Sequence, residues 1–328
     1  MDIYDVLILG AGPAGLFGAF YAGMREMRTK IVEALPEPGG QLAVLYPEKY
    51  IYDVAGCPRI LAKDLVRNLV EQCEQWHPTF CFEERGEALR RLESGVWELA
   101  TDRAAHHARA VIICAGIGAF RPNKLANETV EQFENGGGVY YFIQDKSPFY
   151  KKDLLVVGGG DSAVDWALNL KDYARSVTLI HRREGFRAHE SSLAQLMKSS
   201  VKVLTFYEIR RLEGEGHVER AVIFDNRTNE ETTLHVDAVL LNLGFKANLG
   251  AIKDWGLEFD GRYIKVNGRQ ETNLPGVYAA GDICKQEGVE PLNLIATGFG
   301  QAAVAVNHAY SALTGKSVFP GHSSEMRL

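Results

Sequence analysis

The sequence has few cysteines, and none of them form a recognisable pair. Its 328 residues include five cysteines, at positions 57, 73, 81, 114 and 284, and no two are spaced as C-x-x-C. An odd number at these spacings indicates neither a disulfide framework nor a cysteine-based zinc site, and no metal site is predicted. Reduced thiols are typical of the cytoplasm, which is therefore the expected compartment.

Signals for a membrane or for nucleic acid are also lacking. No run approaches the roughly 18 apolar residues of a membrane span. The apolar start carries Asp2 and Asp5 where a signal peptide would carry basic residues. The net charge is −6, so the chain as a whole is expected to repel nucleic acid and anionic membrane surfaces. We therefore expect neither a membrane nor a nucleic-acid partner.

What is present is a globular composition with a surplus of glycine. The chain is 46% hydrophobic and 24% charged, which excludes a disordered chain. At roughly 150 residues per domain its length predicts two domains. Glycine occurs 33 times, whereas an average usage of about 7% would give roughly 23. The surplus requires a reason in the backbone.

A first group of glycines follows a buried strand predicted at residues 3–9. The turn has the form G-x-G-x-x-G and consists of Gly10, Ala11, Gly12, Pro13, Ala14 and Gly15, before a predicted helix at 16–26. Such glycines permit a tight turn, close approach of a pyrophosphate and close helix packing. Glu33 ends the next strand, 23 residues after Gly10, near the spacing of a carboxylate that binds ribose. This predicts a dinucleotide with a free ribose diol; the alternative is a turn that binds nothing.

The same unit recurs after residues 154–157. Its turn region consists of Gly158, Gly159, Gly160, Asp161, Ser162 and Ala163. The same offset of 23 residues ends at His181, which precedes Arg182 and Arg183, with Arg187 nearby. A guanidinium group suits a ribose 2′-phosphate, so this second site is predicted to bind NADP. The alternative is a solvated cluster of basic residues.

Two dinucleotide sites in one chain fit an enzyme that passes electrons between a nicotinamide and a bound flavin. The segments at 110–122 and 238–245, where strands lead into glycines, are predicted to connect the domains. The expected fold is α/β with two Rossmann-like domains. Residues 1–117 and 246–328 would form a discontinuous FAD domain, and residues 118–245 an inserted NADPH domain.

Further motifs carry a family resemblance over essentially the whole chain. They lie at residues 39–53, 159–167, 181–190, 272–283, 293–303 and 320–324. These motifs resemble the two-dinucleotide-domain flavoprotein reductases, in particular the ferredoxin–NADP reductases of the thioredoxin-reductase-like type. Thioredoxin reductases carry a redox C-x-x-C upstream of the second glycine motif. Here Phe142 and Asp145 stand in the two cysteine places, which makes exchange through an internal dithiol chemically unavailable.

The resemblance implies a homodimer that transfers hydride between NADPH and N5 of FAD, and single electrons between FAD and ferredoxin or flavodoxin. It implies that Tyr46 stacks on one flavin face, that His322 of the C-terminal tail covers the other, and that Ser323 lies near N5. The further FAD-binding residues that the resemblance implies are Glu33, Gly40, Gln41, Leu42, Phe120, Gly281, Asp282 and Ser324. The positive end of a helix starting near Ala296 would stabilise the anionic reduced flavin.

Several expectations concern the partner and the alternatives. Arg59, Lys63 and Arg67 are spaced i, i+4, i+8 on a predicted helix and form the predicted docking patch for an acidic ferredoxin. An ordinary solvated helix face is the alternative. His106 and His107 lack the companions of a metal site and are expected where the chain approaches a strand. Two other functions stay open: an NAD(P)H oxidase or reductase of another acceptor, and a non-catalytic flavin-binding redox sensor.

Overall fold

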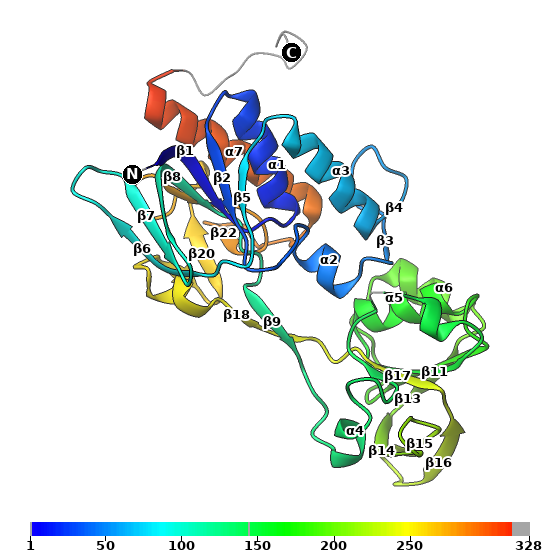
Figure 1. Cartoon of the computed structure of the whole chain (residues 1–328). Helices are drawn as coiled ribbons and strands as arrows, with labels where there is room; N and C mark the ends of the chain where they lie inside the picture. Colours follow the sequence, from blue (N-terminus) through cyan, green and yellow to red (C-terminus); the bar gives the residue numbers. More distant parts are fainter. Residues whose placement is uncertain (1, 144, 317–328) are drawn as a thin grey trace. The chain divides into compact units, whose positions relative to one another are not determined.

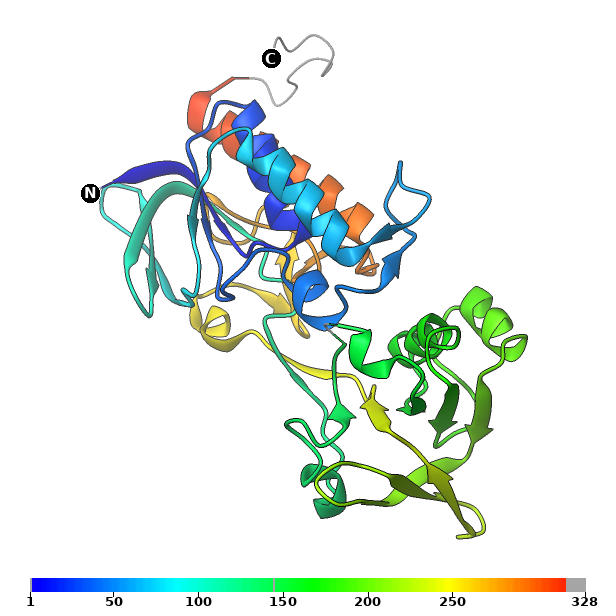
Figure 2. The ribbon, with the colours of Figure 1, turned by 45° about the vertical axis from the view of Figure 1, so that its right-hand side comes forward.

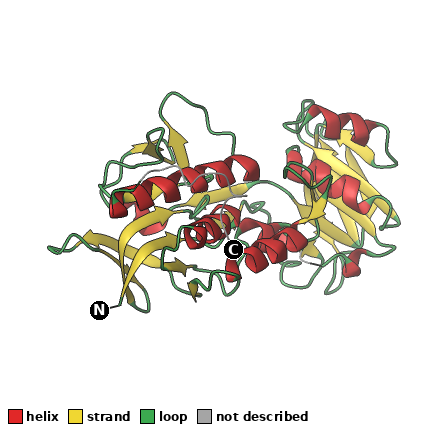
Figure 3. Cartoon of the chain, turned by 90° about the horizontal axis from the view of Figure 1, so that it is seen from above, coloured by secondary structure: helices red, strands yellow, loops and turns green. Residues whose placement is uncertain are grey.

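The computed structural model describes residues 2–143 and 145–316 and divides into two compact units (Figure 1). The first comprises the described residues of the ranges 1–44, 50–119 and 247–328, and the second those of 45–49 and 120–246. Each unit combines a sheet with helices (Figure 3), which confirms the predicted α/β class. Within the described residues, no helix is both long enough and apolar enough to cross a membrane.

The main sheet of the first unit has the order β5-β2-β1-β8-β7-β6, with β21 beside β8. Its strands are β1 (Ile3–Leu9), β2 (Thr29–Val32), β5 (Thr79–Cys81), β6 (Gly86–Arg91), β7 (Trp97–Thr101), β8 (Ala105–Ile113) and β21 (Val277–Ala279). β1 runs parallel to β2 and to β8, whereas β6, β7 and β8 pair antiparallel. The carboxyl ends of β1, β2 and β8 therefore lie at one edge, where such sheets bind nucleotides.

Helix α1 packs between two other helices of the first unit (Figure 2). The three helices are α1 (Pro13–Met24), α3 (Ala62–Glu74) and α7 (Ile295–Thr314). At Gly18 of α1 a Cβ would lie 3.6 Å from Ile8 Cδ1 on the sheet and 3.6 Å from Ala302 Cβ on α7, which is ordinary van der Waals contact, so α1 packs closely against both at this point. Smaller elements complete the unit: α2 (Gln41–Leu45), β3 (Tyr50–Ile51), β4 (Ile60–Leu61), η2 (Gly250–Asp254), β19 (Phe259–Asp260), β20 (Tyr263–Val266) and β22 (Cys284–Gln286).

The second unit contains a five-stranded parallel sheet in the order β10-β17-β11-β12-β13. Its elements are β10 (Val139–Tyr140), β11 (Asp153–Val157), β12 (Ser176–His181), β13 (Lys202–Thr205), β17 (Ala238–Leu241), α4 (Glu128–Glu131), η1 (Ser147–Phe149), α5 (Asp161–Leu170) and α6 (Glu190–Met197). A separate antiparallel sheet consists of β14 (Tyr207–Glu213), β15 (Arg220–Asp225) and β16 (Glu231–His235). The connecting segments pair as β9 (Ala119–Pro122) and β18 (Phe245–Asn248).

Strand β11 contributes to two hydrophobic clusters, one on each face of its sheet. Leu154 and Val156 belong to one cluster, and Leu155 and Val157 to the other. This alternation follows from the two-residue period of a strand. Because helices or strands cover both faces, nearly every residue of β11 can be apolar, as is usual for a central parallel strand. The glycine turn that follows β11 is thus attached to the core of its unit.

The predicted docking patch does not lie on one helical face. Helix α3 begins at Ala62, so Arg59 precedes it, and the i, i+4, i+8 spacing does not put its side chain on a helical face with those of Lys63 and Arg67. The Arg59 guanidinium instead lies 5.1 Å from the centre of the Tyr50 ring, and Arg67 pairs with Asp64 at 2.9 Å. The β3–β4 hairpin, which the spacing argument overlooked, explains the error. His106 and His107 were also misplaced, since both lie inside β8.

Candidate functional site

The first glycine turn is shaped by close backbone contacts. Gly10 has φ +106°, and a Cβ on it would lie 2.5 Å from the carbonyl oxygen of Cys114. A Cβ on Gly15 would lie 1.9 Å from the carbonyl oxygen of Gly10. Gly12, by contrast, has nothing within 4 Å of where a Cβ would be and is the N-cap of α1. The open position at Gly12 and the free N–H groups of the helix end fit a pyrophosphate.

Glu33 lies directly beside this turn. One of its carboxylate oxygens accepts a hydrogen bond from the amide of Ala11 at 2.6 Å, and the other accepts one from Leu35 at 2.9 Å. Burial raises the pKa of Glu33, and these amide donors oppose that shift. A carboxylate has about four acceptor positions, so capacity for ribose hydroxyls is left. The arrangement fits a nucleotide with a free ribose diol.

Asp282 joins the same unit from the far end of the sequence. Its carboxylate accepts a hydrogen bond from Gln41 Nε2 at 3.3 Å, and the preceding amide of Gly281 donates to Gln301 Oε1 at 2.9 Å. Burial raises the pKa of Asp282, and the Gln41 contact opposes the shift. Gln301, on α7, was not among the predicted residues. A carboxylate here would repel phosphate and attract hydroxyl donors, which fits the sugar-alcohol chain of FAD.

Two further features surround this carboxylate. Helix α7 begins at Ile295, as expected for a helix starting near residue 296. A hollow beside Asp282 is lined by Gly116, Ile117, Leu249, Lys253, Arg262 and Asp282. The sequence reasoning had not singled out Lys253 or Arg262. The positive charge of Arg262 opposes the rise that burial causes in the pKa of Asp282.

The other predicted FAD residues are distributed unevenly. Gly40 lies close to the glycine turn, since a Cβ on it would be 3.2 Å from Gly12 Cα, and Leu42 is fully buried in α2. Tyr46 belongs to the second unit, where it packs against the cluster that contains Leu154. The Phe120 side chain lies outside the described part of the structure, as do three predicted tail residues, His322, Ser323 and Ser324.

The second glycine turn is as crowded as the first. Gly158 has φ +152°, and a Cβ on it would lie 2.4 Å from the carbonyl oxygen of Asn242. The His181 ring occupies the space above Gly159, where a Cβ would lie 2.2 Å from its Cε1. Burial lowers the pKa of His181, and the charges of Arg182 and Arg183 lower it further. The imidazole is therefore neutral at pH 7.

Three arginines follow this turn on the loop after β12. Arg182, Arg183 and Arg187 are exposed, and within residues 2–143 and 145–316 no ion pair is formed by their guanidinium groups. The loop is held by its backbone. Arg187 N donates to Gly159 O at 2.6 Å, and Asn226 Nδ2 donates to Arg182 O at 3.0 Å. Free guanidinium groups on a fixed loop are suited to an anionic ligand such as a 2′-phosphate.

Asp161, Ser162 and Ala163 have different environments at the start of α5. Asp161 accepts a hydrogen bond from His189 N at 2.9 Å, so its side chain also holds the arginine loop. Ser162 is exposed, whereas Ala163 is buried against Gly158. Asn226 and Asp161 both anchor the arginine loop, and each contacts a loop residue that is far from it in the sequence. For Asn226, no local motif could have indicated this.

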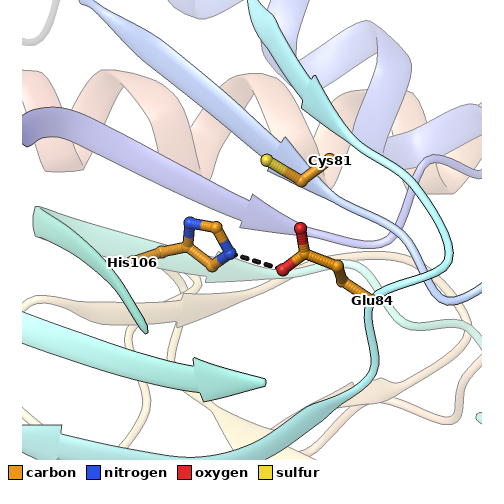
Figure 4. A group of neighbouring side chains, drawn as sticks. All are labelled: Cys81, Glu84 and His106. Atoms are coloured by element: carbon orange, nitrogen blue, oxygen red, sulfur yellow. Dashed lines mark hydrogen bonds and ion pairs between the residues drawn. The ribbon is translucent and has the colours of Figure 1, made fainter. Parts of the chain in front are cut away.

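A separate cluster in the first unit contains Cys81, Glu84 and His106 (Figure 4). Both ring nitrogens of His106 are engaged: Nε2 lies 2.7 Å from Glu84 Oε2, and Nδ1 lies 3.2 Å from the Lys30 ammonium group. A metal bound to Nε2 would require a proton on Nδ1, facing that ammonium group. The cluster is therefore an internal ion-pair network in which the imidazole bridges Lys30 and Glu84.

The cysteines show no arrangement for thiol chemistry. All five are free. Burial raises the pKa of Cys284 to about 12 and raises that of Cys114, so neither is a thiolate at neutral pH. Cys284 is buried and Cys57 is partly buried.

Two glycine turns with different ribose-side residues, on two α/β units, define a two-nucleotide oxidoreductase fold. Residues 4–309 match the family described as pyridine nucleotide-disulphide oxidoreductase, and the chain belongs to it. It is an oxidoreductase whose cofactors are FAD and NADPH.

Known relatives and structures agree with this family. A protein of Symbiobacterium thermophilum named ferredoxin–NADP reductase is 57% identical over 99% of this chain and 98% of its own length. One of Thermus thermophilus with the same name is 53% identical over 99% and 97%. Thioredoxin reductase from Lactococcus lactis superimposes with a TM-score of 0.80 at 26% identity, covering 95% of this chain and all of that one.

Proposed function

We propose that this chain is a ferredoxin–NADP reductase. Bound FAD supplies the chemistry of exchanging a hydride with NADPH on one side and single electrons with ferredoxin or flavodoxin on the other. The observation that carries the proposal is the contrast between the two ribose positions. A buried carboxylate, Glu33, lies beside the first glycine turn, whereas the arginines that follow the second have no ion-pair partner within residues 2–143 and 145–316. The names of the 57% and 53% identical relatives support the same activity.

In this proposal the first unit holds FAD. The amides around Gly12 bind the pyrophosphate, Glu33 binds the adenosine ribose, and Asp282, oriented by Gln41, accepts from the hydroxyls of the ribityl chain. The N-terminal end of α7 stabilises negative charge on the reduced ring. Tyr46 and the tail residues His322, Ser323 and Ser324 complete the flavin environment, as the family resemblance implies.

The second unit holds NADPH. The turn at Gly158–Gly160 receives the pyrophosphate, and Arg182, Arg183 and Arg187 bind the 2′-phosphate. The neutral His181 ring packs on Gly159 and orients the start of the arginine loop. Because no cysteine pair is available, electrons leave from the flavin to the acceptor protein, with ferredoxin as the partner.

The test is an anaerobic titration of the FAD-loaded protein. NADPH is expected to bleach the flavin absorbance, NADH to do so far less efficiently, and oxidised ferredoxin to restore it. A spectrum that NADPH leaves unchanged would indicate a flavin-binding sensor instead. Rapid aerobic NADPH consumption without ferredoxin would indicate an oxidase.

We also propose a cytoplasmic homodimer. Five free thiols fit a reducing compartment. Partly exposed aromatic rings gather on α1 and α7, where Phe17 lies 5.0 Å from Phe299 and 5.7 Å from Phe20 between ring centres. Such a surface suits a second copy of the chain. Light scattering at micromolar concentration should give twice the mass of one chain; a monomer mass would contradict the dimer.

A further inference from the structure

We propose that Asn242 binds the nicotinamide half of NADPH through its side-chain oxygen. The inference rests on the proposed NADPH site of the second unit. It starts from an unusual atom: Asn242 Oδ1 is shielded from solvent and has no hydrogen-bond partner in the described residues. Buried polar atoms in folded proteins nearly always have a partner. A buried acceptor without a partner next to a glycine turn therefore points to a ligand that donates.

The backbone of Asn242 forms part of the glycine turn. Asn242 directly follows β17, and its amide donates to Val157 O at 2.9 Å, continuing the ladder between β17 and β11. Its own carbonyl oxygen is the atom that a Cβ on Gly158 would approach to 2.4 Å. Asn242 thus lies at the carboxyl edge of the sheet, beside the proposed pyrophosphate position.

The order of the strands identifies which half of the dinucleotide is nearby. Across the sheet the strands lie in the order β17-β11-β12. The arginine loop follows β12 and so lies on one side of β11. A dinucleotide crosses such a sheet above the central turn, with its halves on opposite sides. If the adenosine 2′-phosphate is on the β12 side, the nicotinamide ribose is on the β17 side. That is the side of Asn242.

The chemistry of the ligand agrees with an acceptor at this position. The pyrophosphate offers only acceptors, which Oδ1 cannot use. The nicotinamide half offers donors: two ribose hydroxyls and the carboxamide N–H groups. The oxygen of Asn242 therefore fits that half. The same contact would help to fix the orientation of the nicotinamide, which hydride transfer requires.

The experiment compares two ligands on the FAD-loaded full chain by calorimetry. NADP⁺ contains both halves, whereas 2′,5′-ADP contains only the adenosine half with its 2′-phosphate. Asn242→Ala should weaken NADP⁺ binding about tenfold, which is about 1.4 kcal/mol, and change 2′,5′-ADP binding less than twofold. Arg182→Ala is the matched comparison, because it should weaken both ligands by the same factor.

The thermal midpoint without NADP⁺ provides a second readout. Deleting an unpartnered oxygen should leave this midpoint unchanged or raise it, and Asn242→Leu, of similar size, replaces the alanine variant if that one folds poorly. Equal loss of both ligands, or no loss of NADP⁺ affinity, would overturn the role of Asn242. Failure of the wild-type protein to bind NADP⁺ would instead refute the proposed nucleotide site.

Discussion

Removing the Arg182 guanidinium should abolish much of the preference for NADPH over NADH. Arg182 is exposed, has no ion-pair partner among the described residues, and has its backbone fixed by Asn226 at 3.0 Å. Its side chain is therefore free for the 2′-phosphate, while the loop is held before the ligand arrives. Arg182→Ala should lower kcat/KM for NADPH and leave kcat/KM for NADH nearly unchanged, because NADH has no 2′-phosphate.

The size of the effect follows from the bond that is lost. A hydrogen bond to a charged group contributes about 1.5–3 kcal/mol. At about 1.4 kcal/mol per factor of ten, this is a loss of roughly 10- to 150-fold in kcat/KM for NADPH. Arg182→Lys should recover part of it, since lysine keeps the charge but not the planar fork. The assay is initial-rate kinetics with both nucleotides and a fixed acceptor.

A matched control lies at the other end of the same strand. Arg175 precedes β12, and its guanidinium pairs with Asp153 at 2.8 Å, far along the strand from the glycine turn. Arg175→Ala removes the same charge from the same unit and should not alter the ratio of the two kcat/KM values. Equal losses for NADPH and NADH in Arg182→Ala, or an equal change of the ratio in Arg175→Ala, would refute the assignment.

Other predictions concern stability. Gly158→Ala should lower the thermal midpoint, because φ is +152° and the new Cβ would meet a carbonyl oxygen, whereas Gly185→Ala, in open space, should not. Leu155→Ala should cost about 2–5 kcal/mol in urea unfolding, since Leu155 is fully buried; a cost below 1 kcal/mol would contradict its place in the core. Burial raises the pKa of Asp282, so the folded FAD-free protein holds more protons than the unfolded chain, and its unfolding free energy should fall as pH rises through that range. Asp282→Asn should remove this part of the pH dependence of the unfolding free energy and weaken FAD binding. An unchanged pH dependence in this variant would contradict the role of Asp282.

Local patterns predicted the elements around the two turns well. The strand expected at residues 3–9 is β1 (Ile3–Leu9), because a buried strand next to a glycine turn has an apolar run with a clear end. The second strand before a glycine turn, expected at 154–157, begins one residue earlier in β11. Both turns depend on spacing within about 25 residues, which a sequence displays directly.

Contacts between distant segments could not be predicted in this way. Arg59 was assigned to a helix because its spacing fits, but spacing does not reveal where the β3–β4 hairpin ends. Asn226 reaches Arg182 across 44 residues, and Gln41 reaches Asp282 across 241. The ring nitrogens of His106 contact Lys30 and Glu84, which belong to two other segments of the chain. Such partners are set by the packing of sheets and loops.

The way the arginine loop is attached has a consequence for how this protein can change. In the proposed NADPH site its guanidinium groups set the nucleotide preference, whereas the loop is anchored by hydrogen bonds from its backbone to Gly159, Asp161 and Asn226. Backbone anchors are indifferent to the side chains on the loop. Side chains there can be exchanged while the turn and core stay intact, so a change from NADPH to NADH is within reach of a few substitutions, in evolution or in the laboratory.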